Sequence, residues 1–86
     1  MTDEQIIGII NSSLAEEFEL DQDKMVPEAM LYDDLGLDSL DRVDTVIVLE
    51  QAFKIKIREE EAIREIKTLG DIHRFVINKL ASLGHA

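Results

Sequence analysis

The stretch on which the fold depends is LGLDSLDRV, residues Leu35–Val43. Gly36 permits a tight or left-handed turn, and Asp38 with Asp41 has the spacing of a helix N-cap and its N3 partner. A helix is therefore predicted to start here, with Ser39 in its first turn. A serine at such a place is ordinarily a capping residue. The turn, the helix dipole and the flanking acids favour a second interpretation, an attachment point for a phosphate ester that would meet free backbone N–H groups.

The helix that follows is predicted over residues 39–53, and it has two apolar stripes. The first contains Val46, Leu49 and Phe53, at the i, i+3, i+7 spacing of a core-facing side. A core needs only one stripe, so the second either meets a partner or is covered by the loop before the helix, and we favour the partner. The second stripe and its acidic border form the predicted docking face, which consists of Leu40, Asp41, Val43, Asp44, Ile47 and Glu50.

Upstream, Thr2 and Gln5 have capping-box spacing, and apolar residues then recur every four positions from Ile6 onward. This pattern predicts a first helix of about 15–17 residues. Residues 19–37 have no sustained period and are predicted to form a long loop that apolar anchors pack down. A short extra helix near Pro27–Leu31 is the alternative for part of it. The predicted anchors are Leu20, Met25, Val26, Met30, Leu31, Leu35 and Leu37.

Downstream, the segment Phe53–Arg58 alternates apolar and basic residues, as a half-buried strand would. Several residues of the preceding helix are β-branched, so a hairpin in an α+β fold is an open alternative. We prefer the helix, because its cap is good and its apolar stretch spans several turns. Residues 54–58 are then extended or helical, and Ile55 and Ile57 are expected to enter the core.

Two further helices are predicted near the end of the chain. A short one covers Glu59–Ile66, and a longer one starts at the Thr68–Asp71 capping pair and ends at Gly84. The predicted fold is all-α, a four-helix bundle of three longer helices and one short third helix, with a long first loop. Residues 1–86 are expected to form a single domain, because domains of this length are common.

The charge of the chain restricts its partners. The net charge is −10, and residues 1–53 contain 14 acids and 2 bases. Such a charge argues against nucleic acid and anionic membranes and favours basic partners. There is no cysteine, and no apolar run reaches the roughly 20 residues of a membrane span. The acidic start, Met1–Glu4, differs from a basic targeting peptide, so we expect a cytoplasmic location. We also expect the protein to be a monomer.

Other candidate sites are weaker. Nothing resembles a G-x-S-x-G elbow, and no histidine pair has metal-ligand spacing. His73 is expected at the solvent border of the last helix. Carboxylates at Asp33, Asp34, Asp38 and Asp41 form a candidate weak site for Ca or Mg, since these cations take several carboxylate oxygens; the alternative is a solvated acidic rim.

The run Asp33–Asp41, DDLGLDSLD, resembles the prosthetic-group attachment motif of acyl carrier proteins. The resemblance extends through Val43, Leu49–Glu50 and Phe53 to the last helix, and so covers essentially the whole chain. It implies a 4′-phosphopantetheine arm on Ser39, flanked by Gly36, Asp38 and Leu40, that holds acyl groups as thioesters. The chain itself would be a non-catalytic carrier in fatty-acid, lipid or polyketide biosynthesis. Its implied partners are a phosphopantetheinyl transferase, which loads the arm from coenzyme A, and acyl-processing enzymes with basic docking patches.

The chain departs from the housekeeping members of that family at three places. Arg42 stands where a small hydroxyl residue is common, and Thr45 replaces a usual leucine on the docking helix. The basic residues Lys54, Lys56 and Arg58 replace a generally acidic segment. These differences suggest a specialised carrier with its own partners. The alternatives are a polyketide or aminoacyl carrier, an unmodified acidic helical interaction module and, less favoured, a small cation-binding protein.

Overall fold

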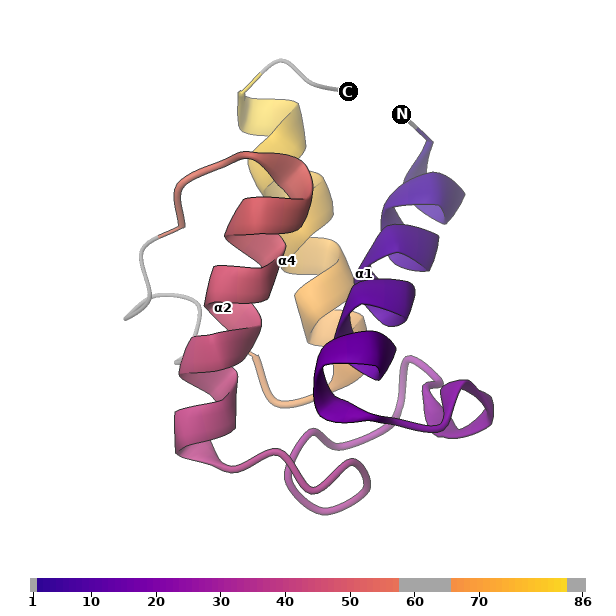
Figure 1. Ribbon diagram of the computed structural model, residues 1–86. Helices are drawn as coiled ribbons and strands as arrows, with labels where there is room; N and C mark the ends of the chain where they lie inside the picture. Colours follow the sequence, from indigo (N-terminus) through magenta and orange to yellow (C-terminus); the bar gives the residue numbers. More distant parts are fainter. Residues whose placement is uncertain (1, 58–65, 84–86) are drawn as a thin grey trace.

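The computed structural model describes residues 2–57 and 66–83, and over these residues the regular structure is helical. Helix α1 runs in the opposite direction to α2 and α4 and contacts both (Figure 1). The all-α class predicted from the sequence is therefore confirmed. The elements in chain order are α1 (Asp3–Phe18), the short 3-10 helix η1 (Gln22–Lys24), α2 (Ser39–Phe53) and α4 (Leu69–Ser82).

The three α-helices begin where capping was predicted. Each N-cap side chain accepts a backbone N–H from its N3 residue, and the N3 side chain accepts the N–H of the cap residue. The pairs are Thr2 with Gln5, Asp38 with Asp41, and Thr68 with Asp71. The short helix predicted over Glu59–Ile66 and the helix end predicted at Gly84 fall outside the described residues, apart from Ile66, which is buried.

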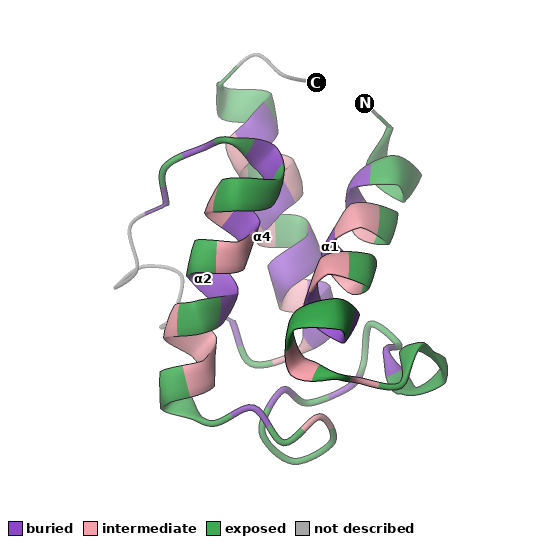
Figure 2. Ribbon diagram, viewed as in Figure 1, coloured by how far each residue is buried: buried purple, intermediate pink, exposed green. Residues whose placement is uncertain are grey.

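The core lies where the three described α-helices face one another, as the residues coloured as buried in Figure 2 show. Val46, Leu49 and Phe53 of α2 are buried, which confirms the predicted core-facing stripe. Burying an apolar side chain of this size contributes about 1.5–3 kcal/mol, so these periodic residues hold the bundle together. Of the largest side chains, those fully buried are Ile10, Leu14, Leu31, Val46, Leu69, Ile72 and Val76.

The connection between α1 and α2 is the long loop that was predicted. It contains η1, which was not predicted, whereas the alternative helix near Pro27–Leu31 is absent and that stretch forms turns. Val26 and Met30 are exposed, so their prediction as anchors was wrong: Ala29 and Leu31 take the inward positions beside them. The predicted anchors that are buried are Met25, Leu31 and Leu37.

Backbone hydrogen bonds fasten this loop to the start of α4. The N–H of Leu31 donates to the carbonyl of Lys67 at 3.0 Å, and the N–H of Gly70 donates to the carbonyl of Pro27 at 2.8 Å. A Cβ at Gly70 would lie 2.9 Å from that carbonyl oxygen, closer than atoms can approach without a shift. The glycine is therefore needed because the loop passes directly over the helix.

The segment after α2 has no regular secondary structure in residues 55–57. Lys54 ends α2 in the left-handed conformation, with φ of 55°, and Ile55 and Ile57 are then buried. Residues 55–57 are not helical, so the helical alternative for this segment was wrong there, and the hairpin alternative was wrong because residues 39–53 form a helix. Arg58 lies outside the described residues.

Within the part of the chain that the structure describes, the helices are too short and too polar to cross a membrane.

Candidate functional site

The predicted attachment residue, Ser39, is the first residue of α2 and is exposed to solvent. The N-cap is Asp38, whose Oδ1 accepts the N–H groups of Leu40 and Asp41, each at 3.0 Å. Oδ2 of Asp41 accepts the N–H of Asp38 at 3.2 Å and completes the capping box. Because Asp38 caps the helix, the hydroxyl of Ser39 is not needed as a cap.

The backbone before Ser39 is held firmly. The N–H of Leu37 donates to the carbonyl of Leu31 at 2.7 Å, and both side chains are buried. Between them the chain makes a turn that ends at Gly36, whose φ of 71° lies in the left-handed region that glycine adopts without strain. The predicted glycine turn is confirmed, and it fixes the serine at the end of the bundle where the long loop lies (Figure 1).

The structure corrects one part of the sequence interpretation. The N–H groups of Leu40 and Asp41 donate to the side chain of Asp38, and the N–H of Arg42 donates to its carbonyl at 3.1 Å. Three of the donors that were expected to meet a phosphate are thus already bonded, and only the N–H of Ser39 itself makes no hydrogen bond within the described residues. A positive side chain near Ser39 would help to offset the charge of an anion there.

Arg42 supplies the positive charge that lies nearest in the sequence. It is the only basic residue of α2, and its side chain is half-buried. Its Nε is buried without a hydrogen-bond partner, and its guanidinium makes no ion pair with a carboxylate of the described residues. A phosphorylated group on Ser39 fits this surrounding, because a free hydroxyl and an unpartnered cation lie one helical turn apart.

The second apolar stripe of α2 is open to solvent. Leu40 is 76% exposed and Ile47 is 41% exposed, with Val43 half-buried between them and Asp44 exposed beside them. The alternative in which the long loop covers this stripe was therefore wrong. Figure 2 shows the resulting exposed side of α2, which faces away from α1 and α4.

Two other residues of α2 have structural roles that the sequence did not suggest. Glu50, predicted as an exposed docking acid, is half-buried, and its Oε2 accepts the N–H of Ile57 at 3.2 Å. Thr45, predicted to alter the docking helix, is fully buried, and its hydroxyl donates to the carbonyl of Asp41 at 2.9 Å. Glu50 therefore holds the segment after α2, and Thr45 belongs to the core.

The predicted cation site is not formed. Among the described residues, no three Asp, Glu or His side chains are grouped so that they could hold a metal ion. Asp34 instead accepts the N–H of Met30 at 2.7 Å, Asp38 and Asp41 form the capping box, and Asp33 is exposed. Asp34, Asp38 and Asp41 thus hold the backbone near Ser39 through hydrogen bonds. Only Asp33 fits the alternative of an acid that is simply exposed to solvent.

His73 was expected at a solvent border and is buried instead. Its Nε2 lies 2.8 Å from Oδ1 of Asn11, so a proton on Nε2 makes a hydrogen bond between α4 and α1. Burial, together with the positive charge of Arg74, lowers the pKa of His73 below its ordinary value. The sequence feature that could have indicated the burial of His73 is its position next to Ile72, at the edge of the apolar face of the last helix.

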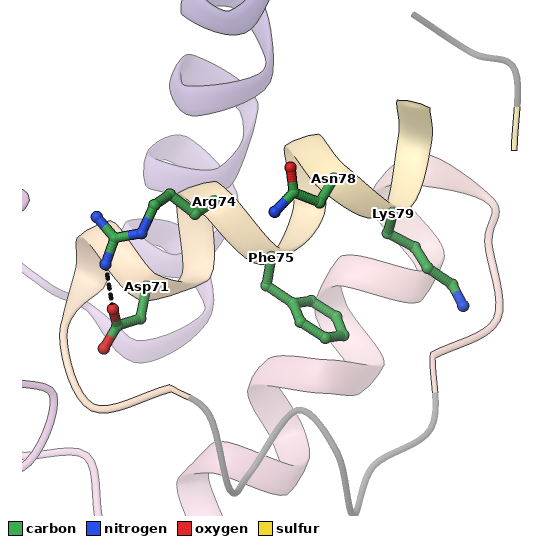
Figure 3. A pocket seen from close by; sticks show the side chains of 5 residues that line it. All are labelled: Asp71, Arg74, Phe75, Asn78 and Lys79. Atoms are coloured by element: carbon green, nitrogen blue, oxygen red, sulfur yellow. Dashed lines mark hydrogen bonds and ion pairs between the residues drawn. The ribbon is translucent and has the colours of Figure 1, made fainter. Parts of the chain in front are cut away.

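A separate pocket of about 420 Å³ lies against α4 (Figure 3). Asp71 and Arg74 form an ion pair at one end, and the ring of Phe75 lies toward the other. Burial raises the pKa of Asp71, but hydrogen bonds from Lys67, Thr68 and Arg74 outweigh it and lower that pKa overall. The residues that line the pocket include none of the predicted site residues. Its one carboxylate, Asp71, is paired with Arg74.

Comparison with known proteins identifies the family to which this chain belongs. The family described as "Phosphopantetheine attachment site" matches residues 9–76. The chain is 37% identical to an acyl carrier protein of Thermosynechococcus vestitus over 82 residues, which is 95% of this chain and 100% of that one. It is 38% identical to an acyl carrier protein of Thermotoga maritima over 77 residues, 90% of this chain and 94% of the relative. The chain therefore belongs to the phosphopantetheine-attachment family, among the acyl carrier proteins, which are non-catalytic carriers with a covalently attached 4′-phosphopantetheine.

Proposed function

We propose that Ser39 is the residue to which 4′-phosphopantetheine is attached, through a phosphodiester on its hydroxyl. The observation that supports this most is the exposure of Ser39 at the first helical position while Asp38 serves as the cap. The group, once attached, supplies a thiol that carries acyl thioesters, and the chain has no cysteine of its own. The role of the chain's own residues is to hold the serine in place and to bind partners.

Intact-mass measurement after incubation with coenzyme A and a broad-specificity phosphopantetheinyl transferase tests this assignment. We expect the mass to rise by one phosphopantetheine, and we expect no rise for Ser39→Ala. The serine is exposed, so the alanine variant should unfold at the same urea concentration as the unsubstituted protein. A mass gain that persists in Ser39→Ala would place the attachment elsewhere, and no gain on folded protein would exclude attachment.

We also propose that the exposed side of α2 is the docking face for partner enzymes. Leu40 and Ile47 supply exposed apolar surface, and Asp44 supplies a carboxylate that makes no hydrogen bond within the described residues. Such a surface suits a partner with a basic patch around an apolar centre. The expected partners are the transferase that loads the arm and the enzymes that process its acyl cargo.

A charge reversal at Asp44 separates docking from folding. Asp44→Lys should lower kcat/KM of the transferase about tenfold, because a rim charge acts mainly on association. Glu16→Lys is the matched control, since Glu16 is exposed on α1 and changes the net charge equally. Equal losses in both variants would mean that the partner senses only the total charge of the carrier.

The basic residues near the docking helix support a specialised carrier. Arg42 and the exposed Lys54 and Lys56 alter the charge near α2 relative to housekeeping members. We expect low turnover with a housekeeping fatty-acid synthase, and turnover equal to that with its own carrier would contradict this. The pathway within fatty-acid, lipid or polyketide biosynthesis, and a cytoplasmic location, stay predictions.

A further inference from the structure

Arg42 has a nitrogen whose bonding the fold leaves unexplained. Its Nε is buried and has no hydrogen-bond partner, although buried N–H donors in proteins are nearly always bonded. The residue as a whole is half-buried, so part of its side chain lies against the protein. An unbonded donor at this depth suggests that its partner is a group the polypeptide does not itself contain.

The helix geometry brings this side chain close to Ser39. The two residues are three positions apart on α2, and such residues are neighbours with Cβ atoms about 5–6 Å apart. Side chains in an α-helix lean toward its N-terminus and cover the preceding turn. For Arg42 that preceding turn is the one that begins with Ser39.

The two carboxylates of the capping box at the start of α2 already accept backbone N–H groups. Asp38 lies four positions before it, but its side chain accepts two backbone N–H groups. Asp41 is bound to the N–H of Asp38. The same capping box occupies the N–H groups of Leu40 and Asp41, which a phosphate on Ser39 would otherwise meet. The structure thus places a cation that has no ion pair among the described residues close to a serine with few free backbone donors around it.

We propose that the guanidinium of Arg42 binds the phosphodiester of the prosthetic group on Ser39 and so fixes the direction in which the arm leaves the helix. This inference rests on the proposed attachment at Ser39. A phosphodiester carries two non-bridging oxygens and one negative charge, which the planar fork of an arginine matches with two parallel N–H donors. Arg42 is here a positioning residue, and no bond of the prosthetic group is made or broken by it.

NMR of the Arg42 side chain tests the contact directly. The Nε–H signal is followed in ¹⁵N-labelled protein before and after loading with coenzyme A and the transferase, and Arg42→Lys identifies it by its disappearance. On loading, we expect the signal to shift and its hydrogen exchange with water to slow about tenfold. Arg74 is the internal control. It lies on α4, where its guanidinium pairs with Asp71 of the same helix, and its signal should not change.

A thermal measurement gives an independent readout. Loading should raise the Tm of the unsubstituted protein by about 4 °C more than it raises that of Arg42→Gln, with Arg42→Lys in between. An unchanged Nε–H signal in protein whose mass shows full loading would overturn the role of Arg42, as would equal Tm changes in the three proteins. Failure to gain mass would overturn the attachment itself, so the two failures are distinguishable.

Discussion

The burial of His73 makes stability depend on pH in a way that one substitution can isolate. The residue is 4% exposed between α4 and α1, and its Nε2 lies 2.8 Å from Oδ1 of Asn11. Burial first, and the charge of Arg74 second, lower its pKa below the ordinary value of 6.5. The folded protein therefore holds the ring neutral at a pH where the unfolded chain protonates it.

The sign and size of the effect follow from proton linkage. Below pH 6.5 the unfolded chain binds a proton that the folded protein does not, so stability is lost as the pH falls. If the folded ring stays neutral, the loss between about pH 7.5 and about pH 5.5 reaches at most about 1.4 kcal/mol. Asp71 does not contribute in this window, because its pKa is lowered from 3.8 and its stabilisation is lost only in stronger acid.

Urea denaturation of the unsubstituted protein and of His73→Gln at these two pH values measures the effect. Glutamine keeps an N–H donor for Asn11 but does not titrate. We expect the unsubstituted protein to lose more stability than the variant on acidification, by up to about 1.4 kcal/mol. The other histidine, His85, is present in both proteins and cancels. The same pH dependence in both proteins would refute the argument that His73 is held neutral.

Three further predictions concern stability and are checked by urea denaturation. Gly70→Ala should destabilise the protein by about 1–3 kcal/mol, because the added Cβ would meet the carbonyl oxygen of Pro27. Gly8→Ala should stabilise it by about 0.5–1 kcal/mol, because the space around Gly8 is open and alanine favours the helix. Asp38→Ala should cost about 1–2 kcal/mol and Asp38→Asn much less, since asparagine also caps helices; equal losses would exclude capping as the cause. Glu50→Ala should cost about 1 kcal/mol and speed hydrogen exchange at the N–H of Ile57, whereas Glu50→Gln keeps an acceptor; unchanged exchange would contradict this.

The features that the sequence predicted well are those that depend on neighbours along the chain. A capping box is made by residues three positions apart, so its residue types alone indicate where α2 begins. The core side of α2 was likewise predictable, because Val46, Leu49 and Phe53 repeat with the period of a helix. The glycine turn before Ser39 is local for the same reason.

The features that were missed depend on segments distant in the sequence. His73 is buried because α1 packs over it and Asn11 meets its ring. Glu50 is half-buried because the chain turns back after α2 and presents the N–H of Ile57. The need for glycine at position 70 could not be predicted from the helical pattern, because it depends on contact with a loop more than forty residues earlier in the chain. Periodicity identifies which residues are apolar, but it cannot indicate which polar residues the rest of the fold will cover.

The acids of α2 also divide into two kinds, which bears on how a partner would approach the proposed docking face. Asp41 and Glu50 each accept a backbone N–H, so their carboxylates are held in place. Asp44 is exposed and makes no such bond within the described residues, so its side chain is the one free to reach a partner's lysine or arginine. A carboxylate that is fixed by a hydrogen bond attracts a basic partner by its electrostatic field over several ångströms. A carboxylate that is free to move can form a direct ion pair with it. The carboxylates that organise the helix would therefore guide a basic partner toward α2, and Asp44 would make the contact.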